Sequence, residues 1–244
     1  MGILDQLRKE ADQKRSSEQQ ELDNEQQREF AYKQQILPKM QELFKYLQEL
    51  VEHLNYLDVP VQVEDYCLRY PKLGSLVQKD YRISTDGYGG LADMNKLMQI
   101  DISFYCAGAG EFEYIVQGKA AIEKEIAYLY SKRLSAKNQK IVGTSNEEVE
   151  KFRVKRLIPV RLRFEVDYGD SLIKVIINNY TDFCSYTDSW QAGEINEAFL
   201  DHLARYLLRK DSEFIKPKIS DEQRDILRKK LAVIKKTEGE RKLW

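Results

Sequence analysis

The sequence has few cysteines and histidines, and those it has are scattered. Its three cysteines, Cys67, Cys106 and Cys184, form no CxxC pair, and neither of its two histidines lies near one of them. A disulfide framework, or a zinc site built from neighbouring residues, is therefore not expected, and a reducing compartment such as the cytoplasm is the predicted location. We expect neither a metal nor a cofactor.

The chain also lacks any apolar run of the roughly 18 to 20 residues that a membrane-spanning helix needs. Its start has no apolar core of a signal peptide, and Gln6 stands where a myristoylation signal has serine or threonine. Charge of one sign does not dominate, because 39 basic residues are balanced by 40 acidic ones. This balance argues against a general attraction to nucleic acid or to an anionic membrane.

Catalytic motifs are absent as well. No serine lies in a Gly-x-Ser-x-Gly elbow, and the stretch CAGAGE lacks the third glycine and the Lys-Ser/Thr of nucleotide-binding loops. His202 is predicted on the apolar side of a helix, where a histidine is more often a hydrogen-bonded core residue than a base. His53 is predicted to be exposed. The sequence therefore identifies no reaction and argues weakly against an enzyme.

What the chain has near its start is charge without apolar residues. Residues 8–29 contain only Ala11 and Leu22 as apolar residues, and no proline or glycine. This composition favours helix, but no face can be buried, so the segment is predicted to be either a solvated helical arm or disordered. A weakly amphipathic tip precedes it and is a candidate partner-binding surface: Ile3, Leu4 and Leu7.

From residue 30 the apolar residues repeat with the spacing of an amphipathic helix. Three of every seven positions are apolar, a face wider than the seam of a two-stranded coiled coil. Pro38 is expected to break or kink the helix near Leu37, leaving a docked helix from about 38 to 56. One side of it is predicted to lie on a sheet through Leu43, Leu47 and Leu50. The candidates for contact with another chain are Phe30, Leu37, Met40 and Phe44.

Beyond residue 58 the period of the apolar residues falls from 3.6 to 2, which is the period of strands. The clearest case is 149–168, where apolar residues alternate with charged ones. Pro159 is expected to divide this run or to lie at a sheet edge. The stretch AGAGE, residues 107–111, is predicted to be a hairpin turn between strands 98–106 and 112–116.

Further strands and helices complete the predicted fold. Strands are expected at 59–63, 79–84, 172–180 and 183–187, and helices at 119–134, 194–210 and 220–236. The result is an α+β fold with a largely antiparallel, one-sided sheet packed with helices, plus a long N-terminal helical arm. The predicted divisions are an arm at 1–29, a core domain at 30–213, and a C-terminal helix with a charged tail at 214–244.

The long alternating strand also carries a basic stripe. Because alternate strand residues share a face, Arg153 with Lys155 and Arg161 with Arg163 are candidate phosphate-binding residues. Acidic residues on the same face, Asp101 among them, are expected to pair with these cations, as is common on a solvated sheet.

One leading prediction and two alternatives follow. The leading prediction is a non-catalytic interaction or scaffold protein, which forms a homodimer through its N-terminal helices or binds another protein. The first alternative is a nucleic-acid-binding module that uses the basic sheet face. The second is a small-ligand-binding or enzymatic fold with its pocket between the sheet and the helices.

Overall fold

A computed structural model of the whole chain describes residues 2–87, 93–141, 147–211 and 214, except for the side chains of residues 5–7. The chain divides into two compact units, Met1–Asp201 and His202–Trp244, and each is considered by itself. The helix predicted at 220–236 lies outside the described residues. The three predicted divisions of the chain therefore stay a prediction.

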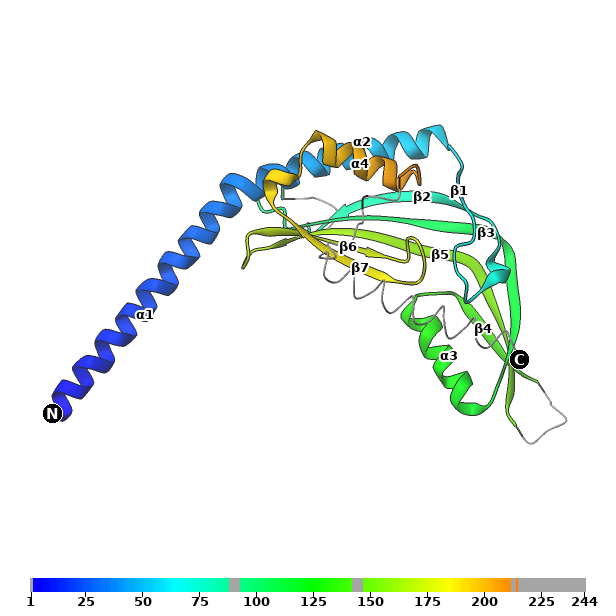
Figure 1. Cartoon of the computed structure of the whole chain (residues 1–244), viewed down its shortest axis with the longest axis horizontal. Coiled ribbons are helices and arrows are strands. Elements are labelled where there is room, and N and C mark those ends of the chain that lie inside the picture. The colour runs from blue at the N-terminus through cyan, green and yellow to red at the C-terminus, as the bar shows by residue number, and fades with distance from the viewer. Residues whose placement is uncertain (1, 88–92, 142–146, 212–213, 215–244) are drawn as a thin grey trace, which may run out of the picture. The chain divides into compact units, whose positions relative to one another are not determined.

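The chain begins with two α-helices joined by a π-helical turn. Helix α1 spans Ile3–Ala31, the π-helical segment η1 spans Tyr32–Ile36, and α2 spans Leu37–Leu57. Figure 1 shows α1 extending beyond the sheet, whereas α2 lies across it. Pro38 explains the π-helical turn, because proline has no N–H and its ring crowds the carbonyl of the residue four positions earlier. The kink predicted near Leu37 is therefore an underwound, π-helical turn just before it, and the helix does not break.

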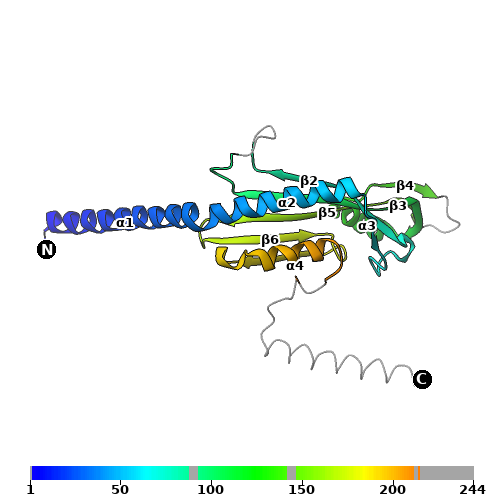
Figure 2. The ribbon, with the colours of Figure 1, turned by 90° about the horizontal axis from the view of Figure 1, so that it is seen from above.

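Helix α2 docks on the sheet through the side that the sequence predicts. Met40, Leu43, Leu47, Val51 and Leu54 are buried along it, and the helix lies over β2 and β3 (Figure 2). Two polar side chains fix its position. The Gln41 amide donates to the Met94 carbonyl at 2.6 Å, and the Asn55 amide donates to the Tyr81 carbonyl at 2.8 Å. The apolar face of α2 is thus covered within the chain.

In the described residues, seven antiparallel strands form one sheet in the order β1-β2-β3-β5-β6-β7, with β4 pairing to β5. The strands are β1 Val61–Val63, β2 Leu76–Thr85, β3 Gln99–Gln117, β4 Ala136–Ile141, β5 Val149–Asp167, β6 Leu172–Asn178 and β7 Ser185–Trp190. Helix α3 spans Lys119–Ser131 and α4 spans Glu197–Leu207, with short 3₁₀ helices at Pro71–Leu73 and Ala192–Glu194. The predicted α+β fold, with its antiparallel sheet and long N-terminal helix, is confirmed.

The glycine-containing stretch after residue 106 is a bulge within β3, so the predicted hairpin turn there is wrong. Ala107 pairs with Leu157 and Glu111 pairs with Lys155, which leaves residues 108–110 opposite Arg156 alone. The Arg156 guanidinium holds the bulge, because it donates to the carbonyls of Leu73 (2.6 Å), Ser75 (2.9 Å) and Ala109 (3.1 Å). A Cβ at Gly108 would lie 2.8 Å from Arg156 Cζ, so glycine is needed for this close approach.

Strand β5 is also continuous, so Pro159 does not divide it. Strand β4 pairs with β5 only up to Val154, and β6 pairs only from Arg161 onward. Residues 156–160 therefore pair with β3 alone, and we call this gap between β4 and β6 the notch. Pro159 lies in the notch, where its missing N–H breaks no ladder hydrogen bond. At Pro159 strand β5 has a neighbour on one side only, as an edge strand does. Along the rest of its length, β5 has neighbours on both sides.

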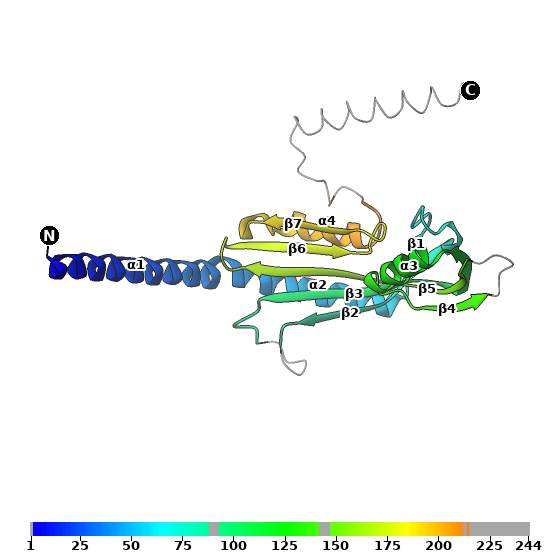
Figure 3. The ribbon, with the colours of Figure 1, turned by 90° about the horizontal axis from the view of Figure 1, so that it is seen from below.

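Helix α3 lies on the opposite side of the sheet from α2, as Figures 2 and 3 show together. Its buried residues are Ile122, Glu125 and Leu129. Aromatic rings surround it, with Tyr128 close to Phe183 at 6.2 Å and to Tyr70 at 6.3 Å between ring centroids. None of the helices in the described part of the chain has an apolar stretch long enough to cross a membrane.

Candidate functional site

The hydrophobic candidates for partner binding fall into two groups. Ile3, Leu4 and Phe30 are exposed on α1, and the Phe30 side chain is 65% exposed. Leu37 and Phe44 are half-buried, and Met40 is fully buried in the core, so Met40 is not accessible to a partner in this structure. The side chain of Leu7 lies outside the described residues. Only the α1 members of the set therefore present a free surface.

The basic candidates on β5 are largely engaged by carboxylates. Asp101, which is only 6% exposed, accepts hydrogen bonds from Arg161 Nε (2.8 Å), Arg161 Nη2 (2.7 Å) and Arg163 Nε (3.1 Å). Burial alone would raise the pKa of Asp101, but the hydrogen bonds and charges of the two arginines together lower it. Arg153 Nε pairs with Glu113 at 2.7 Å. Lys155 is exposed. The stripe is thus interrupted by acidic groups, as the sequence predicted for Asp101.

A second cluster, which the sequence did not indicate, surrounds Glu125 of α3. Its carboxylate is 7% exposed and accepts hydrogen bonds from the hydroxyls of Tyr70 and Tyr114, both at 2.5 Å. Arg69 Nη2 donates to the same carboxylate at 2.5 Å, and its guanidinium lies 4.0 Å from the centre of the Tyr128 ring. Burial and then the bond to Glu125 raise the pKa of Tyr70 to about 12. The donors outweigh burial and lower the pKa of Glu125.

A cavity of about 360 Å³ opens beside this cluster, between β3 and α3. Aromatic rings of Tyr70, Phe112 and Tyr114 line it, and the cations Arg69 and Lys72 stand at it with Glu125. Because the Glu125 carboxylate already has three donors, this carboxylate is satisfied without a ligand. The cavity combines an apolar wall with a polar end, which is a common design of small-ligand sites.

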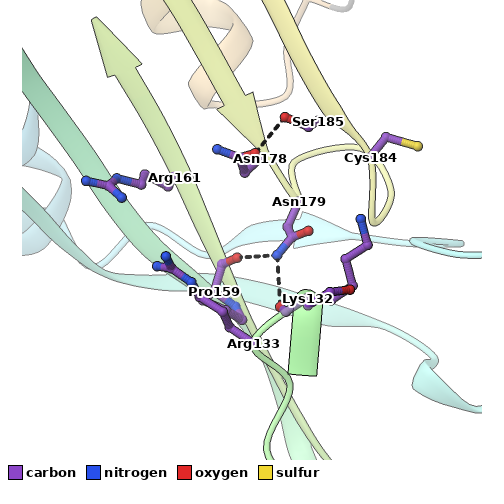
Figure 4. Close-up of a pocket in the computed structure, with 9 residues that line it drawn as sticks. Lys132, Arg133, Pro159, Arg161, Asn178, Asn179, Cys184 and Ser185 are labelled. Carbon is purple, nitrogen blue, oxygen red and sulfur yellow. Dashed lines mark hydrogen bonds between the residues drawn. The ribbon is translucent and has the colours of Figure 1, made fainter. Parts of the chain in front are cut away.

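A third arrangement lies at the notch, where a cavity of about 200 Å³ is enclosed by the end of α3 and by β5, β6 and the start of β7 (Figure 4). Asn179 forms its inner side. The side-chain amide of Asn179 donates to the carbonyls of Lys132 (3.2 Å) and Pro159 (3.0 Å), and the main-chain carbonyl of Asn179 accepts from the Tyr66 hydroxyl at 2.7 Å. These bonds replace the missing strand partner and fix the end of α3 against β5.

The backbone at the notch is unusual at Arg133. Leu134 N–H donates to the Leu129 carbonyl and Arg133 N–H donates to the Tyr130 carbonyl, both at 3.0 Å, which is the double bond of a Schellman helix end. This geometry places Arg133 at φ 56°, where glycine is the usual residue. An arginine side chain is therefore kept at the cavity in a backbone conformation that disfavours it.

The cations of the notch differ in how far they are paired. Among the described residues, no carboxylate lies within ion-pairing distance of Lys132 or Arg133. Arg161 is held rigidly by Asp101 through Nε and Nη2, which leaves Nη1 without a partner in the described part of the chain. Asn178 Oδ1 accepts from the Ser185 hydroxyl at 2.7 Å, so the Asn178 amide nitrogen is available as a donor.

Metal-ligating side chains are not clustered in the part of the chain that the structure describes. No group of three or more histidine, cysteine, aspartate or glutamate side chains there is placed to hold a metal ion. His53 and His202 are both exposed, so the buried position predicted for His202 is wrong. Position 202 lies at the margin of the apolar side of its helix. The sequence pattern does not distinguish the margin of such a side, which is exposed, from its buried centre. Comparisons with family models, curated proteins and solved structures gave no match to this chain.

Proposed function

We propose that the protein is a non-catalytic interaction protein that self-associates through helix α1. The observation that carries the proposal is the exposure of α1: every side chain from residue 8 to residue 30 is exposed, although the helix continues into α2. Most helical stability in proteins comes from tertiary packing and little from propensity alone. A helix of 29 residues whose side chains pack on no other described part of the chain is typical of a segment that pairs with another.

Three apolar residues of α1 share one side of the helix, whereas Ile3 and Phe30 lie on other sides. Leu4, Ala11 and Leu22 are separated by 7 and 11 residues, which are close to two and three helical turns. Charge is divided along the helix as well. Residues 2–16 carry four basic and three acidic side chains, whereas residues 17–31 carry five acidic and one basic. The basic half precedes the acidic half.

This order of charge favours an antiparallel pair of α1 helices. When residue n of one copy lies opposite residue 33 − n of the other, Ala11 faces Leu22. Two ion pairs flank that contact on the same side of the helix, and by symmetry each occurs twice: Arg8 with Glu25, and Arg15 with Glu18. A parallel pair would instead place like charges together. The order of basic and acidic residues along this face of α1 is complementary to itself. It therefore supports a second copy of this chain as the partner.

The expected affinity is modest. Burying a leucine contributes about 1.5–3 kcal/mol, and this register buries two leucines, Leu22 of each copy, beside four facing ion pairs. Association costs about 4–15 kcal/mol, which is of similar size, so we expect a dissociation constant of roughly micromolar to millimolar. Sedimentation velocity must therefore cover about 10–500 µM, the range in which such a pair would form.

Charge exchange on α1 gives a specific test. The double variants Arg8→Glu/Arg15→Glu and Glu18→Arg/Glu25→Arg should each be monomeric, because each places like charges opposite one another. An equimolar mixture of the two should restore the dimer, since all four facing pairs become complementary again. Sedimentation velocity on the whole chain measures both results.

The control exchanges charge outside this face. Asp12→Arg/Asp23→Arg alters net charge as much as the second variant, yet both positions lie on another side of α1. It should still dimerise. A wild-type chain that stays monomeric across the whole concentration range contradicts the proposal, as does a mixture that fails to recover the dimer.

The cavity beside Glu125 favours a second candidate function, the binding of a small aromatic ligand. Its three aromatic side chains and two cations suit an aromatic anion. The fluorescent anion 1-anilinonaphthalene-8-sulfonate should bind the native chain with 1:1 stoichiometry. Pro71→Trp, which fills the cavity, should abolish this binding, whereas Val59→Trp, at an exposed site, should not. Equal binding by both variants would eliminate this candidate.

A further inference from the structure

We propose that the notch binds a single phosphate or similar oxyanion group, held between Arg133 and Arg161 with help from Asn178. This site is independent of α1 and of the proposed self-association. Both guanidinium groups line the cavity, and Figure 4 shows them extending to the same side of the Asn179 amide. The Lys132 side chain extends to the other side of this amide.

Cations without a carboxylate partner distinguish this cavity from most of the basic face. Elsewhere on β5, Arg153 meets Glu113 and Arg163 meets Asp101, while Arg156 is engaged by main-chain carbonyls. At the notch, Lys132 and Arg133 have no carboxylate within ion-pairing distance among the described residues. Two unpaired cations that line one cavity create a local positive potential, which an anion would satisfy.

Fixed donors complete the site. Asp101 holds the Arg161 guanidinium by two bonds, so Nη1 is presented without loss of side-chain freedom on binding. The Asn178 amide is oriented by the Ser185 hydroxyl and adds a neutral donor. The Schellman bonds and Asn179 supply donors to the carbonyls of Leu129, Tyr130 and Lys132, which reduces the negative potential at the end of α3.

The size of the cavity favours one oxyanion group over a polynucleotide. Its volume of about 200 Å³ equals that of about six or seven liquid waters, enough for a phosphate and a small attached group. A nucleic-acid backbone needs a continuous row of unpaired cations. Carboxylates interrupt such a row on both sides of the notch, at Asp101 and Glu113.

The conformation of Arg133 belongs to the helix end and does not by itself indicate a ligand, because Arg209 adopts the same positive φ at the Schellman end of α4. A glycine at position 133 would keep this φ without the penalty that a side chain carries. This contrast gives a variant that separates binding from folding. Arg133→Gly should raise the melting temperature and at the same time remove one cation from the site.

The experiment uses the whole chain and inorganic phosphate as the probe, with sodium chloride at matched ionic strength. Amide NMR signals of Asn178, Asn179 and Arg133 should shift saturably with phosphate. Arg133→Gly should weaken binding by about tenfold or more, because a charge-assisted hydrogen bond is lost. Lys155→Ala removes one exposed cation outside the cavity and should leave the affinity unchanged.

Several outcomes would decide the matter. Competition by sulfate or by glycerol phosphate supports an oxyanion site, and tighter binding of glycerol phosphate identifies a phosphate monoester as the better ligand. An absence of saturable shifts at the notch overturns the proposal. So does an equal loss of affinity in Lys155→Ala, which would indicate diffuse charge. Single-stranded RNA that binds with a salt slope of several phosphates would favour a nucleic-acid face instead.

Discussion

Replacing Asp101 with asparagine tests whether charge pairing holds the basic face of β5 together. The carboxylate is buried and accepts from Arg161 and Arg163, and also from the Gln99 amide at 2.6 Å. An asparagine of the same shape removes the charge and turns an NH₂ group toward donors that need an acceptor. Arg161 then loses its carboxylate partner, and Arg163 keeps only the Glu165 carboxylate at 3.7 Å.

The loss of folding free energy caused by this substitution depends on how exposed the two arginines are. Breaking a fully buried ion pair costs about 3–5 kcal/mol. Here the side chains of Arg161 and Arg163 are 33% and 27% exposed, so water partly compensates them. We expect Asp101→Asn to lower the free energy of unfolding by about 2–3 kcal/mol at pH 7. A chain of this size should then lose about 4–12 °C in melting temperature.

The dependence on pH gives the sharper check. The pKa of Asp101 is lowered by folding, so the stability that its ionised form contributes is present above the unfolded pKa, near 3.9. That contribution is lost as the pH falls through the folded pKa. The difference between wild type and Asp101→Asn, measured by urea unfolding, should therefore shrink below about pH 4.

A control and a refuting result complete this test. Glu165, whose carboxylate is 45% exposed and lies 3.7 Å from Arg163, should tolerate replacement by glutamine with a change below about 0.5 kcal/mol. If Asp101→Asn is as stable as wild type at pH 7, or if its deficit does not vary between pH 7 and pH 3, the carboxylate does not organise this face.

Three further predictions concern the bulge, the Glu125 cluster and the cysteines. Gly108→Ala should destabilise the chain by about 1–3 kcal/mol, because its Cβ would meet Arg156, whereas Gly193→Ala, which meets nothing within 4 Å, should be neutral by thermal unfolding. Glu125→Gln should lower the pKa of Tyr70 from about 12 toward 10 while leaving the part of the shift caused by burial, as phenolate absorbance would show. A thiol reagent should modify the exposed Cys184 quickly and the other two cysteines, both buried, slowly; three equally fast thiols would contradict the described core.

The sequence was informative wherever one period of apolar residues extended over a whole element. The alternation along β5 and the wide apolar face of α2 both predicted the buried side correctly, through residues such as Val160 and Leu47. Strand β4 was missed because it pairs along only one side and is exposed after Ala136, so no alternation marks it. The period of the apolar residues indicates which face of an element is buried, so it cannot reveal a strand whose two faces are both exposed to solvent.

The errors at residue 108 and the missed sites have another origin. Glycines at these positions are equally compatible with a bulge and with a hairpin turn. The bulge forms because of contacts with Arg156, which lies almost fifty residues further along the chain than Gly108. The Glu125 cluster likewise draws its donors from residues 69, 70 and 114. The notch depends on where β4 and β6 stop pairing. These contacts join distant segments, and no local pattern encodes them.

The π-helical turn before Pro38 alters the direction in which α1 presents its apolar side. Leu22 and Met40 are 18 residues apart, which is five whole turns of an ideal α-helix, so they would point the same way in an unbroken one. A π turn inserts one residue and rotates what precedes it by about 100°. Leu22 is therefore turned sideways from the direction in which Met40 meets the sheet. A second α1 could then run alongside the first without colliding with the layer of strands.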